Sequence, residues 1–144
     1  MNVSQLFSSL VQFFVQSPTL KDLKDAIFEK PLTATKHPVN PPVLGFYEAF
    51  LLSDGLLSCK YYSRYMREDN GRFARREILI MEIEDRPGEL FVAFKNGTPT
   101  AWRIGLEKEY RPSITEQEIY TLKCILGEAQ KAVAISAAQS AHAS

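Results

Sequence analysis

The sequence predicts a single α+β domain, with two N-terminal helices and one long C-terminal helix packed on a five-stranded antiparallel meander. A chain of 144 residues is within the usual range of one domain and buries enough surface to fold without a disulfide or a metal. Helical periodicity is confined to the two ends of the chain, and turn signals divide its middle into short apolar arms. These signals are Asp54-Gly55, Asp69-Asn70-Gly71, Arg86-Pro87-Gly88 and Asn96-Gly97.

Residues 1–30 are expected to form the two N-terminal helices. Between residues 4 and 16, apolar side chains recur at helical spacing with Ser and Gln between them, and there is no charged residue. Because helices on membrane surfaces usually carry Lys and Arg, this helix is expected to lie on its own sheet or on a second copy of the chain. The second helix is expected to start with Ser17 as its cap and Pro18 in its first turn, and to end at Lys30.

Residues 31–42 are expected to form an extended connector that lies as a strap across the domain surface. The segment contains four of the eight prolines and has neither a helical nor a strand period. The sheet is then expected over residues 43–106, where the four turn signals separate five strands.

The C-terminal helix is expected over residues 113–138. Thr115 and Glu118 have the spacing of a capping box, in which each side chain bonds the backbone amide of the other residue. Apolar residues then recur over four turns, and this face is expected to pack across the sheet. The apolar residues are Ile119, Leu122, Leu126, Ala129 and Val133.

The hairpin from Leu57 to Glu84 has the most unusual composition in the chain. A two-residue Asn70-Gly71 turn would place Arg64 opposite Glu77, and side chains would alternate between the faces with period two. The face expected under the C-terminal helix carries Phe46, Phe50, Leu52, Leu57, Cys59, Tyr61, Ile78 and Ile80. The opposite face carries Tyr47, Lys60, Tyr62, Arg64, Met66, Arg75, Glu77, Leu79 and Met81.

Six of the 17 basic residues lie between Lys60 and Arg76, which predicts a binding surface on this hairpin. Three interpretations compete: a protein-recognition surface, a surface for single-stranded nucleic acid, or ordinary cross-strand pairs on a solvated face. The net charge of zero and the neighbouring carboxylates disfavour nucleic acid. We therefore expect a protein partner or self-association as a homo-oligomer. The candidate partner-binding residues are Lys60, Tyr62, Arg64, Arg67, Arg72 and Arg75.

The sequence favours a noncatalytic protein without a cofactor or a metal. His37 lies in the proline-rich connector and His142 in the C-terminal tail, and neither has the neighbours of a metal site. No phosphate-binding glycine loop or nucleophile-elbow motif occurs. A carrier of a small apolar ligand, held between the sheet and the C-terminal helix, is a further alternative. Its aromatic lining would be Phe46, Phe50, Phe91, Phe94 and Trp102.

A cytoplasmic location is expected. No apolar run is long enough for a membrane-spanning helix, and no basic residue precedes Lys21 as in a signal peptide. Cys59 and Cys124 are expected to be buried reduced thiols, with a single disulfide between them as the alternative.

Overall fold

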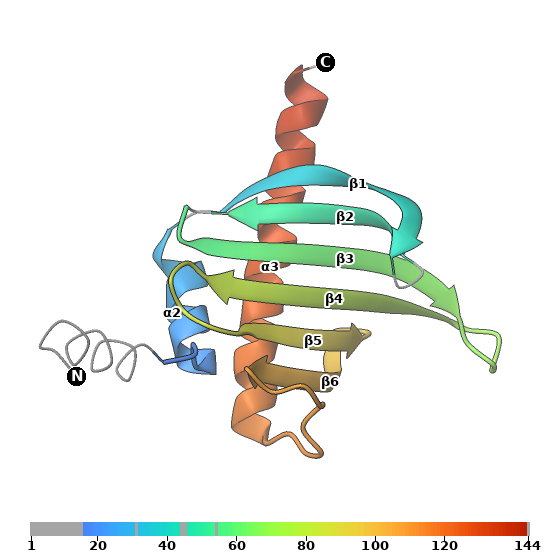
Figure 1. Cartoon of the computed structure of the whole chain (residues 1–144). Coiled ribbons are helices and arrows are strands. Elements are labelled where there is room, and N and C mark those ends of the chain that lie inside the picture. The colour runs from blue at the N-terminus through green and yellow to red at the C-terminus, as the bar shows by residue number, and fades with distance from the viewer. Residues whose placement is uncertain (1–15, 31, 44–45, 54, 144) are drawn as a thin grey trace, which may run out of the picture.

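The computed structural model describes residues 16–30, 32–43, 46–53 and 55–143, and it has one antiparallel sheet with both described helices on the same face (Figure 1). Of the helix expected over residues 4–16, residues 4–15 lie outside the described residues, and Gln16 is not in a helix. The six strands follow one another in the order of the chain. They are β1 (Thr33–Val43), β2 (Phe46–Ser53), β3 (Leu57–Arg67), β4 (Phe73–Ile83), β5 (Glu89–Lys95) and β6 (Thr98–Gly105). The helices are α2 (Leu20–Glu29) and α3 (Glu116–Ala143).

The α+β class and the antiparallel meander are confirmed, but the prediction of five strands is wrong. The proline-rich connector, expected to be a strap, contains β1, which pairs with β2 from Thr33 opposite Ser53 to Pro38 opposite Glu48. Proline cannot donate a ladder hydrogen bond, but an edge strand has one side without a neighbour and tolerates it. The sheet therefore starts ten residues earlier than expected, at Thr33 rather than residue 43.

Helix α2 is capped by Thr19 rather than by Ser17. The Thr19 hydroxyl accepts from the Asp22 amide at 3.1 Å, and the Asp22 carboxylate accepts from the Thr19 amide at 2.9 Å. This capping box satisfies two amides, which a cap at Ser17 would not do because Leu20 is three residues on. The helix ends before Lys30, close to the predicted end.

Helix α3 packs across the sheet, as predicted. Its capping box is present, since the Thr115 hydroxyl accepts from the Glu118 amide at 3.1 Å and the Glu118 carboxylate accepts from the Thr115 amide at 2.9 Å. The helix runs to Ala143, beyond the predicted end at residue 138. Leu122, Ile125 and Ala129 are buried in the main core. In the part of the chain that the structure describes, no helix combines the length and the hydrophobicity needed to cross a membrane.

The β3–β4 turn has a three-residue loop, and this overturns the predicted faces of β4. The Glu68 amide donates to the Arg72 carbonyl at 2.8 Å, and the Gly71 amide donates to the Glu68 carbonyl at 2.9 Å. A two-residue type I′ turn needs positive φ at both central residues, whereas in this loop only Gly71 has it, at 80°. Arg64 therefore pairs with Arg76 instead of Glu77.

A shift of one residue moves every side chain of a strand to the other face. Arg75, Glu77, Leu79 and Met81 of β4 thus lie on the face covered by the helices, and Ile78 and Ile80 lie on the opposite face. The prediction for the neighbouring strands is confirmed, because Phe50, Leu52, Leu57, Cys59 and Tyr61 belong to the core under the helices. The side chains of Phe46 and Tyr47 lie outside the described part of the structure.

Candidate functional site

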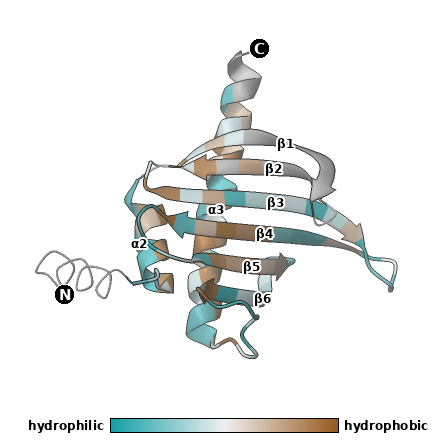
Figure 2. Cartoon of the chain, in the orientation of Figure 1, coloured by the Kyte–Doolittle hydropathy of each residue, from teal (hydrophilic) through white to brown (hydrophobic). Residues whose placement is uncertain are grey.

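The sheet face opposite the helices is covered by neither α2 nor α3, and we call it the open face (Figure 1). Strand pairing identifies its members, because residues directly opposite each other share a face: Tyr62 pairs with Ile78, which pairs with Ala93. Along β4 and β5 apolar residues occupy both faces, which Figure 2 shows as largely hydrophobic colouring of these two strands. The open face includes Lys60, Tyr62, Arg64, Met66, Arg76, Ile78, Ile80, Glu82, Glu89, Phe91, Ala93, Lys95 and Arg103, and Glu68 reaches it from the hairpin turn.

The open face brings together three of the six predicted partner-binding residues, Lys60, Tyr62 and Arg64. Arg67 and Arg72 lie at the exposed end of the hairpin, beside the turn. Arg75 lies on the helix-covered face, and Arg76 takes the place on the open face that the sequence pattern assigned to Arg75. The sequence missed Arg76 because the faces of β4 depend on whether the loop has two or three residues.

An apolar strip runs across the centre of the open face. Tyr62 and Ile78 are 7% and 8% exposed, and Ile80, Phe91 and Ala93 pack against them. Long polar side chains cover part of this strip: the Arg103 guanidinium lies 5.2 Å from the Phe91 ring centroid, and the Tyr110 ring lies 5.8 Å from it. The strip is therefore an apolar surface overlaid by flexible arginine and tyrosine side chains.

Cations outnumber carboxylates on the open face. Glu68, at the hairpin turn, binds Arg76 at 2.9 Å and Lys95 at 3.3 Å, and these bonds hold the pKa of its carboxyl below the ordinary value. Arg103 binds Glu89 at 3.0 Å. The described side chains of this face thus include five cations and three carboxylates. The cations are Lys60, Arg64, Arg76, Lys95 and Arg103, and the carboxylates are Glu68, Glu82 and Glu89.

Arg75 belongs to a buried polar cluster under α3. Its guanidinium Nη2 donates to the Tyr61 hydroxyl at 3.1 Å and lies 3.6 Å from Glu77 Oε2. The Glu77 carboxylate is 1% exposed and accepts hydrogen bonds from the Tyr61 hydroxyl and, at 2.8 Å, from the Gln130 amide of α3. Burial, and then the bond to Glu77, raises the pKa of Tyr61 to about 12. This cluster ties the central hairpin to α3.

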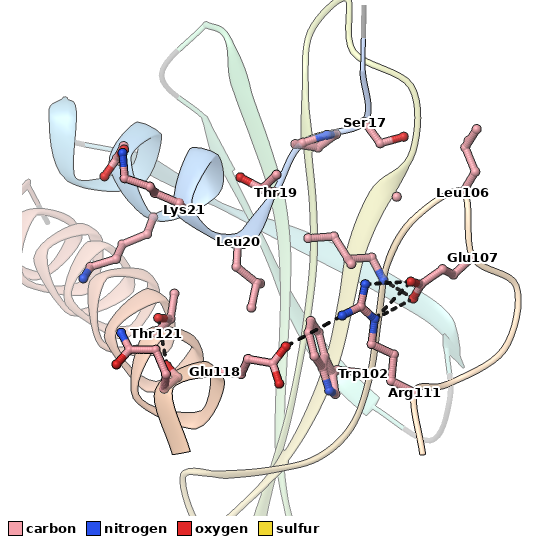
Figure 3. Close-up of a pocket in the computed structure, with 16 residues that line it drawn as sticks. Ser17, Thr19, Leu20, Lys21, Trp102, Leu106, Glu107, Arg111, Glu118 and Thr121 are labelled. Atoms are coloured by element: carbon pink, nitrogen blue, oxygen red, sulfur yellow. Dashed lines mark hydrogen bonds and ion pairs between the residues drawn. The ribbon is translucent and has the colours of Figure 1, made fainter. Parts of the chain in front are cut away.

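A pocket of about 840 Å³ lies between the start of α2, the end of β6 and the start of α3, and we call it the terminal pocket (Figure 3). Its apolar lining comes from Leu20, Trp102, Ile104 and Leu106. In Figure 3 the Leu20 side chain points from α2 toward the interior, and Trp102 lies between Glu118 and Arg111.

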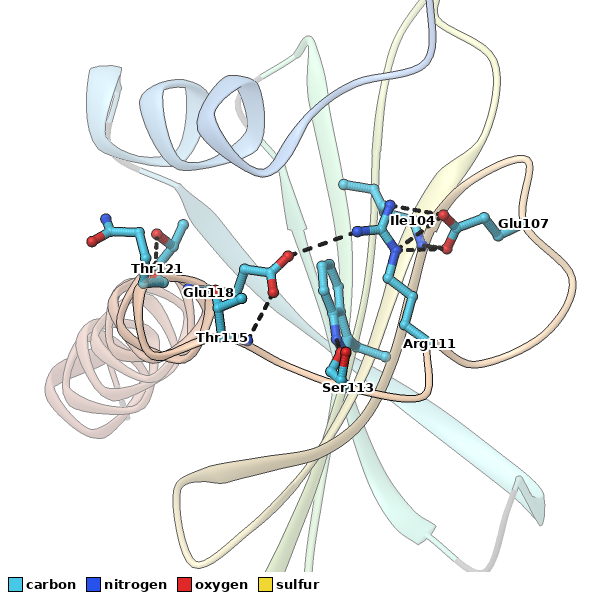
Figure 4. A network of polar contacts seen from close by, with 9 residues as sticks. Ile104, Glu107, Arg111, Ser113, Thr115, Glu118 and Thr121 are labelled. Carbon is cyan, nitrogen blue, oxygen red and sulfur yellow. Dashed lines mark hydrogen bonds and ion pairs between the residues drawn. The ribbon is translucent and has the colours of Figure 1, made fainter.

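Arg111 organises the polar side of the terminal pocket (Figure 4). Its guanidinium binds Glu107, with Nη2 to Oε1 at 2.7 Å and Nε to Oε2 at 3.1 Å, and lies 3.7 Å from Glu118. It also lies 4.6 Å from the centroid of the Trp102 ring. The bonds to Arg111 lower the pKa of Glu107, and the same contact raises the pKa of Arg111. Since the two carboxylates already bind it, Arg111 has a structural role in holding the loop after β6.

The other residues considered from the sequence lie apart from these surfaces. Phe94 and Trp102 are buried in the main core, Phe50 packs against it, and Phe91 lies on the open face, so these aromatic residues do not line one shared cavity. The thiols of Cys59 and Cys124 are free, and burial raises the pKa of Cys59 to about 12. Among the described residues, no three His, Cys, Asp or Glu side chains are grouped as metal ligands. The side chains of His37 and His142 lie outside them.

Comparison of the chain with models of known families, with curated proteins and with solved structures found no match.

Proposed function

We propose that the chain is a noncatalytic protein-interaction module, and that its open face binds a partner segment rich in both acidic and apolar side chains. The observation that carries the proposal is the apolar strip around Tyr62 and Ile78, which no described helix covers and which is flanked by an excess of cations. Tyr62 and Ile78 are 7% and 8% exposed, so a partner would reach the strip by displacing the long side chains that lie over it, such as Arg103 over Phe91. The free thiols of Cys59 and Cys124 support a reducing compartment such as the cytoplasm.

The apolar strip supports a protein ligand because its covering side chains can be displaced. Arg103 lies over Phe91, and a partner's apolar side chain would replace that contact while a partner carboxylate took over the guanidinium. Arginine and tyrosine are enriched among the residues that dominate interface energies. Arginine forks also bind carboxylates in a two-pronged geometry, which favours acidic residues next to the apolar anchors.

Single-stranded nucleic acid is the second candidate, and it is supported by the same cations. Such proteins stack bases on exposed aromatic rings. On the open face Tyr62 is 7% exposed and Phe91 has Arg103 against its ring, so neither presents a bare stacking platform. Glu68 also places a negative charge between Arg76 and Lys95, where a phosphate would have to bind. These contacts favour the protein partner.

A peptide-selection experiment tests the proposal. Random displayed peptides are selected on the wild type and on a Lys60→Glu/Arg64→Glu variant, with Lys123→Glu/Lys131→Glu, at exposed positions of α3, as a control of equal charge change away from the open face. We expect wild type and control to enrich the same acidic and apolar sequences, and the open-face variant to lose them. Identical selections by all three proteins would refute the proposal.

A salt titration separates the two candidates. The nucleic-acid function would be favoured if the protein bound single-stranded RNA more tightly as the salt concentration fell, and if only the open-face variant lost this binding. Circular dichroism and thermal melting of each variant show whether the fold is retained.

A further inference from the structure

The terminal pocket presents apolar surface that the described residues leave uncovered. Leu106 is 71% exposed at its edge, and Leu20 of α2 is half-buried in its wall. The pocket is a cleft of about 840 Å³ that is open to solvent. It lies within the range of clefts that hold a ligand or an inserted chain segment.

The start of the described chain is fixed at the wall of this pocket. Arg86 Nε donates to the Gln16 carbonyl at 2.9 Å, and its Nη2 donates to the Ser17 carbonyl at 3.1 Å. Arg86 also binds Asp22 of α2 at 3.0 Å. Ser17 lies so close to Gly105 that a Cβ at position 105 would come within 3.1 Å of the Ser17 Cβ. The residues before Gln16 therefore leave from a defined point next to the pocket.

The chemistry of the preceding segment matches the pocket. Residues 4–16 repeat Leu and Phe at helical spacing and contain no charged side chain. As a helix, 13 residues would extend about 20 Å, and one face would carry all of Leu6, Phe7, Leu10, Val11 and Phe14. Arg111 is bound to Glu107 and Lys21 lies 3.6 Å from Asp25, while the ammonium group of Lys24 lies 5.4 Å from the centroid of the Tyr120 ring. An uncharged apolar occupant would leave these pairs intact.

We propose that residues 4–16 dock as an amphipathic helix into the terminal pocket of the same chain. The absence of a linker between Gln16 and the pocket favours the chain's own segment over that of a second copy. A tethered segment has an effective concentration in the millimolar range, so modest contacts suffice for docking. The docked segment would cover Leu20 and Leu106 on the helix side of the molecule. It would leave the open face, and therefore the proposed function, unaffected.

Disulfide trapping tests the proposal in the full-length protein. Leu106→Cys is combined with single cysteines placed at each position from 5 to 14, in a Cys124→Ala background that leaves the buried Cys59 in place. We expect intramolecular cross-links to form at least tenfold faster from the apolar positions than from the polar ones, with a period of about 3.6 residues. Ser9→Cys and Gln12→Cys are the matched polar-face controls.

Several outcomes would overturn the proposal. Cross-links that appear only as covalent dimers on a non-reducing gel would assign the pocket to the segment of a second copy. Equal rates at all positions, or no cross-links at any position, would show that the segment does not dock as a helix. A Leu10→Glu/Phe14→Glu variant, compared with Ser9→Glu/Gln12→Glu, supplies a second readout. Only Leu10→Glu/Phe14→Glu is expected to increase hydrogen exchange in residues 104–113. Equal exchange in the two variants would also contradict docking.

Discussion

The Tyr61 hydroxyl of β3 donates a hydrogen bond to the Glu77 carboxylate of β4, and both side chains lie beneath α3. Gln130 donates to the same carboxylate oxygen from the helix, so one carboxylate joins two strands to α3. Buried polar groups of this kind are costly when one member is removed, because the others lose their partner. Glu77 therefore adds a buried polar link between the central hairpin and α3 to the apolar packing of the helix.

Replacing Glu77 by Ala is expected to destabilise the fold by about 3 kcal/mol, because the Tyr61 hydroxyl and the Gln130 amide would lose their acceptor in a buried site. Urea unfolding followed by circular dichroism measures the change. Glu68→Ala is the control, since Glu68 is solvent-accessible and its removal is expected to have little effect. A similar small effect of both substitutions would show that the buried cluster does not stabilise α3.

The stability of the protein is expected to fall at alkaline pH through Tyr61. Its pKa is raised from 10.0 to about 12 in the folded protein, so the folded state holds this proton more tightly than the unfolded state. The associated stability is fully present below about pH 10 and is lost as the pH rises toward 12. The free energy of unfolding is therefore expected to fall less steeply over this window in Tyr61→Phe than in the wild type. Tyr65→Phe, at an exposed position, is expected to follow the wild type.

Replacing Thr115 by Ala is expected to reduce the free energy of unfolding by about 1 kcal/mol, because the Glu118 amide loses its acceptor at the start of α3. Thr115→Ser keeps a hydroxyl at the cap and is expected to restore most of the loss. Thermal unfolding of the three proteins provides the comparison. If Ser and Ala were equally destabilising, the hydroxyl would not be the source of the effect.

Replacing Arg111 by Lys is expected to loosen the loop after β6 while keeping the charge. Lysine cannot reproduce the two-pronged bond to Glu107 or the planar contact with the Trp102 ring. Since Trp102 is the sole tryptophan, its fluorescence quenching by acrylamide reports directly on this site. We expect the quenching constant to rise, because the Trp102 ring loses the planar guanidinium that covers it. Arg72→Lys, at the far end of the hairpin, serves as the control and is expected to leave quenching unchanged.

Local signals predicted α3 and most strand positions, because these depend on a few neighbouring residues. The Thr115 and Glu118 capping box is an example, since its four-residue pattern is sufficient to form both bonds. The same logic applied at Ser17 failed because Thr19 with Asp22 offers a complete box two residues later. When two nearby residues could each cap a helix, the cap forms at the residue whose partner three positions later can accept a hydrogen bond from its amide.

The faces of β4 were not predictable with the same certainty, because they depend on one residue in the hairpin loop. Asp69-Asn70-Gly71 fits both a two-residue turn and a three-residue loop, and only the latter places Glu77 under α3. The candidate surface depends on the same loop. Lys60, Tyr62 and Arg64 precede the loop and were assigned to one face correctly, whereas Arg75 follows the loop and was assigned to the wrong face. β1 was missed because its prolines suggested an irregular segment.

Those prolines have a consequence for how the sheet can meet other chains. β1 contains Pro38, Pro41 and Pro42, and β6, at the other edge, contains Pro99. Neither outer strand therefore offers an unbroken row of backbone donors to an incoming strand. Growth of the sheet from chain to chain through backbone hydrogen bonds, a usual route to fibrous aggregates, is hindered at both edges.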